Sequence, residues 1–158
     1  MMSRVQMGMV AGLAGALAVA GLEAANMALG PWAVPFPRMV AVMLQVPDLA
    51  VAGWVGHFVV GTLLLGPLFG VLSPRLPTDT PETKGIFFAV GAFLVMMLTV
   101  APLSGVGMLG ARAGLMGVLW MLGGHIVFGI VMGNVFGRLA ARQKRLARLH
   151  APEGVAAH

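Results

Sequence analysis

Four long apolar segments dominate the chain, and short polar or proline-rich connections separate them. The segments run over about 5–29, 50–72, 85–101 and 114–137. A helix needs about 20 apolar residues to cross the ~30 Å hydrocarbon core of a bilayer. The pattern therefore predicts an all-α integral membrane four-helix bundle. We expect one transmembrane domain over residues 1–149 and a weakly structured tail over 150–158.

The connection between the first two spans differs from an ordinary loop. Its first part, 31–37, contains three prolines and resists helix formation. Trp32 and Phe36 are aromatic residues that suit the headgroup level. The following stretch, 38–46, is apolar apart from Arg38 and Gln45. We expect an interfacial or shallow re-entrant segment between the first two spans.

Composition excludes a soluble domain. Hydrophobic residues make up 59% of the chain and charged residues 9%, against norms of ~45–50% and ~25% for soluble proteins. The mean hydropathy of +0.94 also excludes a disordered chain. Because the sequence contains no cysteine, disulfides, thiolate metal sites and cysteine nucleophiles are excluded.

The net charge of +5 comes largely from one segment. Five of the ten Lys and Arg residues follow the fourth span directly: Arg138, Arg142, Lys144, Arg145 and Arg148. This placement is typical of a juxtamembrane anchor that binds anionic lipid. No aromatic residue lies among these side chains, so a nucleic-acid partner is not expected.

The distribution of basic residues predicts the orientation of the spans. With four spans, the amino terminus, the middle connection and the carboxyl terminus share one side of the membrane. That side holds eight Lys and Arg residues, and the other side holds only Arg38 and Arg112. By the positive-inside rule, we expect both termini to face the cytoplasm.

The second and fourth spans share a sequence pattern. Both contain G-H-x-V-x-G, at 56–61 and 124–129, followed by G-x-x-F-G, at 66–70 and 133–137. The second copy has one residue fewer between the two motifs. The first and third spans match more weakly, with Met7-Gly8 against Lys84-Gly85. We interpret this as two tandem two-span hairpins, related by an axis along the membrane normal.

These features carry a family resemblance. A Gly-rich first span, the G-H-x-x-x-G of the second span and M-M-L-T-V-A-P-L-S-G at 96–105 resemble a family of small four-span bacterial inner-membrane proteins of unknown function. The resemblance covers most of the chain and implies the four-span fold. It brings no activity, cofactor or catalytic residue.

Glycines are expected to bring the spans into close contact, because small side chains let transmembrane helices approach. The expected packing positions are Gly8, Gly12, Gly61, Gly66, Gly70, Gly129, Gly133 and Gly137. Such faces can also pack against a second copy or a larger membrane complex. The 13 methionines are scattered, and we interpret them as flexible apolar filler rather than as copper ligands.

Three ionisable residues fall within the spans: Glu23, His57 and His125. At 1.5 Å per residue they lie ~9, ~10 and ~16 Å below the outer surface, in one layer of the bundle. Two histidines can ligate haem b, and two histidines with a carboxylate can hold a divalent metal. A His–carboxylate pair can also relay protons or bind a quinone. Alternatively, the three form a buried hydrogen-bond set that fixes helix register.

No nucleophile–base set, phosphate-binding loop or H-E-x-x-H motif is present, so we do not expect an enzyme. The G-x-G-x-x-G at 105–110 follows a transmembrane span rather than a Rossmann strand. Two functions remain. One is a structural or accessory subunit in a homo-oligomer or larger membrane complex. The other is a haem-binding or other ligand-binding membrane protein that uses the intramembrane histidines.

Overall fold

The computed structural model describes residues 1–30 and 33–149, and every regular element within them is helical. Four helical segments are long and apolar enough to cross a membrane: Arg4–Ala28, Ala50–Arg75, Pro81–Leu103 and Gly114–Leu149. This confirms the predicted all-α, four-span architecture. Trp32 and the expected tail over 150–158 lie outside the described residues.

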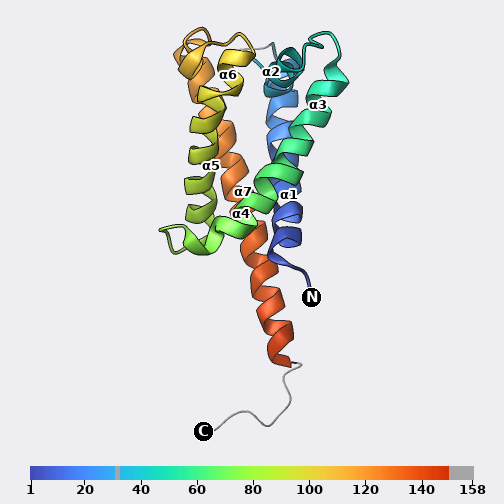
Figure 1. Cartoon of the computed structure of the whole chain (residues 1–158), viewed down its shortest axis with the longest axis vertical. Coiled ribbons are helices and arrows are strands. Elements are labelled where there is room, and N and C mark those ends of the chain that lie inside the picture. Colours follow the sequence, from blue (N-terminus) through green and yellow to red (C-terminus); the bar gives the residue numbers. More distant parts are fainter. Residues whose placement is uncertain (31–32, 150–158) are drawn as a thin grey trace.

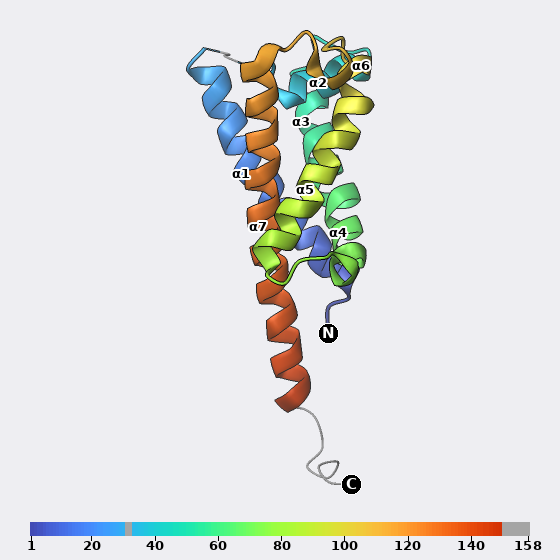
Figure 2. The ribbon, with the colours of Figure 1, turned by 90° about the vertical axis from the view of Figure 1, so that its left-hand side faces the viewer.

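The first and last helices form the centre of the bundle. Helix α1 (Arg4–Ala28) packs along α7 (Gly114–Leu149), α5 (Pro81–Leu98) packs on α7, and the second span crosses α1. The amino terminus, the connection between the second and third spans, and the end of α7 lie at one end of the molecule (Figures 1 and 2). The short helices α2 (Phe36–Met43) and α6 (Val100–Leu103) lie at the other end.

The second span is not a uniform α-helix. It consists of α3 (Ala50–Val59), a π-helical segment η1 (Val60–Leu65), α4 (Gly66–Leu72) and a 3₁₀ turn η2 (Ser73–Arg75). A π turn places residues five apart on one face, where an α turn would place residues four apart. The π segment thus keeps Gly61 and Gly66 on the face toward α1. Pro67 follows directly and removes a backbone donor from the helix.

The third span also ends in a break. Helix α5 stops at Leu98, and α6 begins two residues later. A proline ring clashes with the carbonyl group four residues earlier, so Pro102 prevents α-helical continuation past Leu98. The connection to α7 then turns through glycines with positive φ, including Gly107 at 85° and Gly110 at 74°. The G-x-G-x-x-G pattern is therefore explained by turn formation.

The segment between the first two spans folds back onto the end of the bundle. Helix α2 packs on α3, where Gly53 lies against the carbonyl group of Pro37. The side chains of Met39 and Val40 are buried. Phe36, which was expected at the headgroup level, is the first residue of α2. Its ring is half-buried and packs edge-on against His57, with 5.7 Å between ring centroids.

Two seams of glycine hold the spans together. All eight expected packing glycines lie in them, together with Gly85, which the sequence analysis did not include. Between α1 and the second span, a Cβ on Gly12 would overlap the carbonyl oxygen of Gly61. Between α5 and α7, a Cβ on Gly85 would overlap the carbonyl oxygen of Gly129. Because these contacts lie within one chain, the seam glycines are not left for a partner.

Helix α7 is longer than expected. The apolar pattern predicts a span that ends at 137, whereas the helix continues to Leu149. This extension projects beyond the rest of the bundle (Figures 1 and 2). The five basic residues of the expected anchor are all exposed on it. They form part of a rigid helix rather than of a loosely structured anchor.

Candidate functional site

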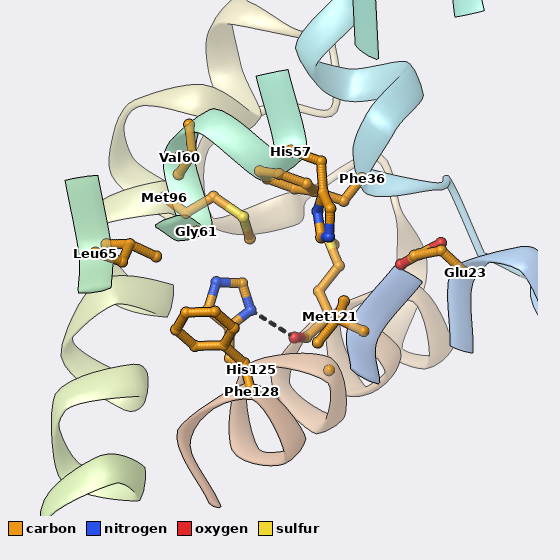
Figure 3. A pocket seen from close by; sticks show the side chains of 12 residues that line it. Glu23, Phe36, His57, Val60, Gly61, Leu65, Met96, Met121, His125 and Phe128 are labelled. Atoms are coloured by element: carbon orange, nitrogen blue, oxygen red, sulfur yellow. Dashed lines mark hydrogen bonds between the residues drawn. The ribbon is translucent and has the colours of Figure 1, made fainter. Parts of the chain in front are cut away.

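Glu23, His57 and His125 line one cavity (Figure 3). They come from α1, α3 and α7, and the cavity lies in the half of the bundle nearer α2. The cavity has a volume of about 60 Å³, and the rest of its wall is mainly apolar. A polar cavity holds one water molecule when it offers more than ~10–15 Å³. The space therefore suits a few waters or a single ion.

His57 has a fixed orientation and a fixed tautomer. Its Nε2 lies 3.0 Å from the carbonyl oxygen of Ala16 on α1. Because a carbonyl oxygen can only accept, Nε2 carries the proton and Nδ1 keeps a lone pair. The ring is enclosed edge-on by Phe36, Trp54 and Phe58, with centroids 5.2 to 6.0 Å away. Trp54, three residues earlier on α3, thus packs on this histidine.

His125 is held in the complementary way. Its Nδ1 donates to the carbonyl oxygen of Met121, one turn earlier on α7, at 2.8 Å. Its Nε2 therefore keeps the lone pair. The ring packs edge-on against Phe93 of α5, with 5.5 Å between centroids. Among the described residues, neither lone-pair nitrogen of the two histidines has a hydrogen-bond partner.

Glu23 is engaged by other groups. Its carboxyl group accepts hydrogen bonds from the side chains of Asn26 and Trp120 and from the backbone N–H of Phe36. The amide of Asn26 also donates to the carbonyl oxygen of Ala33, at 3.0 Å. Glu23 thus ties α1 to α7 and to the start of α2. Trp120 of α7 supplies the contact with that helix.

Of the two ways in which Glu23 could interact with a histidine, directly or through a water or ion, the direct one is absent among the described residues. Within the part of the chain that the structure describes, no ion pair or hydrogen bond joins Glu23 to His57 or His125. In the same residues, no three His, Asp or Glu side chains lie close enough to hold a metal ion. The two-histidine, one-carboxylate metal site is therefore not formed. The carboxyl group shares the cavity but lies on its far side from His125 (Figure 3).

Two of the predicted ligands do not fit the observed site. Pockets for drug-sized ligands and cofactors have volumes of roughly 300–1,000 Å³, and the cavity of about 60 Å³ cannot contain a haem macrocycle. A quinone carbonyl oxygen needs a donor, whereas the ring N–H of each histidine is already bonded to a backbone carbonyl oxygen. The histidines therefore suit an ion or a hydrogen-bond donor.

A path for protons through the bundle is also not supported. Toward the end that carries the amino terminus, the ring of Phe69 packs edge-to-face on those of Phe88 and Phe136, with centroids 5.4 and 5.3 Å apart. The glycine seams close the space beside them. Together with Phe128 of the cavity wall, these rings belong to one buried cluster of apolar side chains, which offers a proton no polar group to pass along.

The cavity wall contains two residues that the sequence analysis treated as filler. Met96 of α5 and Met121 of α7 both reach into it (Figure 3). Met121 lies four residues before His125 on α7, so the two side chains share one helix face. Met96 lies on α5, which no sequence spacing connects with the histidines, and only the packing of the folded bundle makes its association with them visible.

Comparison with known protein families relates nearly the whole chain to one of them. The model of a family of unknown function, DUF6789, matches residues 2–147. The chain belongs to this family. The match spans all four candidate membrane helices, and it agrees with the expected resemblance to an uncharacterised family. No curated protein and no solved structure matches the chain, so the role of a DUF6789 protein has to be argued from its site.

Proposed function

We propose that this DUF6789 protein is a non-catalytic, multi-pass protein of the bacterial inner membrane that binds a metal ion at His57 and His125. One observation carries the proposal. Each histidine donates one ring N–H to a backbone carbonyl oxygen and keeps a lone pair on the other nitrogen, and both rings line one cavity. Metal-binding histidines almost always have this second hydrogen bond, because it fixes the tautomer and the ring.

The environment supports binding rather than catalysis. The rings are held by neighbouring aromatic side chains, and among the described residues the cavity wall contains no serine, threonine or other nucleophile beside them. An ion in such a place is shielded from bulk water on the side of the Phe69 cluster. In this arrangement the protein could store the ion or pass it to a partner. The ion could also be structural and link α3 to α7.

The test is metal binding by purified protein in detergent, with Zn²⁺, Ni²⁺ and Cu⁺ dialysed separately. Two substitutions remove the lone pair and keep the hydrogen bond. His57→Gln retains a donor near Nε2, and His125→Asn retains one near Nδ1. We expect one ion per chain in the wild type and loss of binding in both variants, with helix content unchanged. Binding of no ion, or equal binding by folded variants, would overturn the proposal.

We also propose that the two hairpins are tandem copies. The contact of Gly12 with Gly61 in the first hairpin has its counterpart in that of Gly85 with Gly129 in the second. Aligned on the G-H-x-V-x-G motifs, the first and third spans correspond as Gly12 to Gly85. This is one helical turn away from the match of Gly8 with Gly85. The residue that the second copy lacks falls where the first copy has its π segment.

The proposed orientation places both termini in the cytoplasm. The end of the bundle that carries the amino terminus, the middle connection and the α7 extension has eight Lys and Arg residues in the sequence, and the opposite end has two. Basic residues near span ends stay preferentially on the cytoplasmic side. The cavity then lies in the outer half of the membrane.

The α7 extension favours a second candidate function, that of an accessory subunit. From Arg138 to Arg148 the helix rises ~15 Å, whereas charges at physiological ionic strength are screened beyond ~8 Å. The first turn can bind anionic lipid, while the distal turn reaches an acidic surface of another protein. Replacing Lys144, Arg145 and Arg148 by Gln should then release the protein from a larger complex on native gels. An Arg4→Gln control should leave it there, and an unchanged mobility of the distal variant would contradict this role.

A further inference from the structure

The proposed metal site can be assigned an ion class from the side chains around it. Besides the histidines, Met96 and Met121 line the cavity, and each is only 5% exposed. Figure 3 shows the Met96 side chain entering the space between the two imidazole rings. We infer that the site binds one soft monovalent cation, Cu⁺, through imidazole nitrogens of His57 and His125 and thioether sulfurs of Met96 and Met121. This inference rests on the proposed metal binding.

Ligand softness is the first argument. Thioether sulfur is a soft donor that selects Cu⁺, and imidazole also suits copper, whereas Mg²⁺, Ca²⁺ and Mn²⁺ prefer oxygen ligands. Of the described residues on the cavity wall, Glu23 alone has a carboxyl group, which already accepts hydrogen bonds from Asn26, Trp120 and the N–H of Phe36. Hard divalent ions therefore lack their ligands here.

Charge is the second argument. Two imidazole nitrogens and two thioether sulfurs are all neutral, so the bound ion keeps its full charge in a mainly apolar surrounding. The cost of burying an ion in such a medium is high and rises with the square of its charge. A monovalent ion is therefore favoured over Zn²⁺ or Ni²⁺. The Glu23 carboxyl group, on the same wall, can supply the single compensating charge.

Mobility of the ligands is the third argument. The imidazole rings are fixed by their bonds to backbone carbonyl groups. Methionine has three rotatable side-chain bonds and adapts to irregular space. Cu⁺ is a d¹⁰ ion that accepts low and variable coordination numbers. Two fixed imidazole nitrogens and two adjustable thioether sulfurs can provide them. Met96 and Met121 also belong to one buried cluster, with Phe93 and Met97.

The experiment compares methionine substitutions that keep volume. Leu replaces Met at little packing cost, so Met96→Leu and Met121→Leu remove sulfur and leave the cavity shape. Met97→Leu is the matched control, because Met97 lies on the same helix, is 1% exposed and does not line the cavity. Cu⁺ is titrated into purified protein under ascorbate, in competition with a chromophoric Cu⁺ chelator.

We expect one Cu⁺ per wild-type chain, and affinity lower by at least roughly tenfold, ~1.4 kcal/mol, in the double variant. The control should match the wild type. X-ray absorption of the wild-type complex should show sulfur as well as nitrogen around copper. That spectrum decides the question even where a variant fails to fold.

The outcomes separate the two proposals. Nitrogen-only coordination, or folded methionine variants with wild-type affinity, would overturn the Cu⁺ assignment and leave metal binding at the histidines intact. A preference for Zn²⁺ over Cu⁺ would do the same. Binding of none of these ions would overturn both.

Discussion

Replacing Gly85 by Ala should break the seam between α5 and α7. The added methyl group would overlap the carbonyl oxygen of Gly129 and lie 3.1 Å from the Cα of Gly133. Both are backbone atoms of α7, so no side chain can rotate away. The two helices must separate until contacts return to ~3.5–4.0 Å. We expect Gly85→Ala to destabilise the bundle.

The magnitude follows from two opposing effects. Overpacking of a close contact costs ~1–3 kcal/mol, and a backbone collision belongs near the upper limit. If the two helices move apart by ~0.5–1 Å, each remaining contact of the seam also loses about a quarter to a half of its dispersion energy. Alanine favours the helix over glycine by at most ~1 kcal/mol. The expected net loss is therefore about 2 kcal/mol.

Gly91→Ala provides the matched control on the same helix. No atom lies within 4 Å of the position that its Cβ would occupy. This variant should be neutral or gain up to ~1 kcal/mol. The free energy of unfolding of both variants is measured in detergent by denaturant titration, with tryptophan fluorescence as the readout. Equal stability of the two variants would refute the close approach of α5 and α7.

Three further predictions concern other parts of the molecule. Glu23→Gln should change the unfolding temperature by little, because the amide oxygen still accepts hydrogen bonds from Asn26 and Trp120. Glu23→Leu should lower the free energy of unfolding by ~1–3 kcal/mol, because it leaves these donors unpaired. Equal effects of the two variants in thermal unfolding would contradict the hydrogen-bond set. Leu63 lies in the π segment and is 55% exposed. Its deletion should turn the second span into a continuous α-helix that keeps Gly61 in the seam with α1. A product that circular dichroism shows to be unfolded would argue against the tandem-copy alignment. A reporter active only in the cytoplasm should give signal when fused after residue 158 and none when inserted near Pro47; the reverse pattern would invert the proposed orientation.

The number of spans and their approximate ends could be predicted from the sequence because they depend on local properties. A run of apolar residues long enough to cross hydrocarbon is visible without knowledge of its neighbours. The break after Leu98 follows from Pro102 by local geometry as well, although the sequence analysis did not use it. The extension of α7 to Leu149 was missed for the opposite reason. A polar helix carries no signal in an apolar pattern.

The sequence predicted which ionisable residues belong to the candidate site but not how their side chains are bonded. Glu23, His57 and His125 were identified because ionisable groups are expensive in hydrocarbon and therefore rare. Their depth along each span followed from helical rise, which explains why they share a cavity. The direction of each side chain did not follow. Glu23 shares the cavity with both histidines, but its direct hydrogen bonds go to Asn26, Trp120 and the N–H of Phe36.

What the tertiary structure alone decided is the set of partners across helices. The glycines were recognisable as packing residues, but only the crossing of the spans shows that Gly12 meets Gly61 and that Gly85 meets Gly129. Likewise, Met96 and Met121 are ordinary apolar residues in the sequence and cavity-lining side chains in the bundle. Local sequence encodes burial and length, because each residue carries its own transfer free energy. It does not encode which buried atoms meet, because that depends on the rotation and crossing of every helix at once.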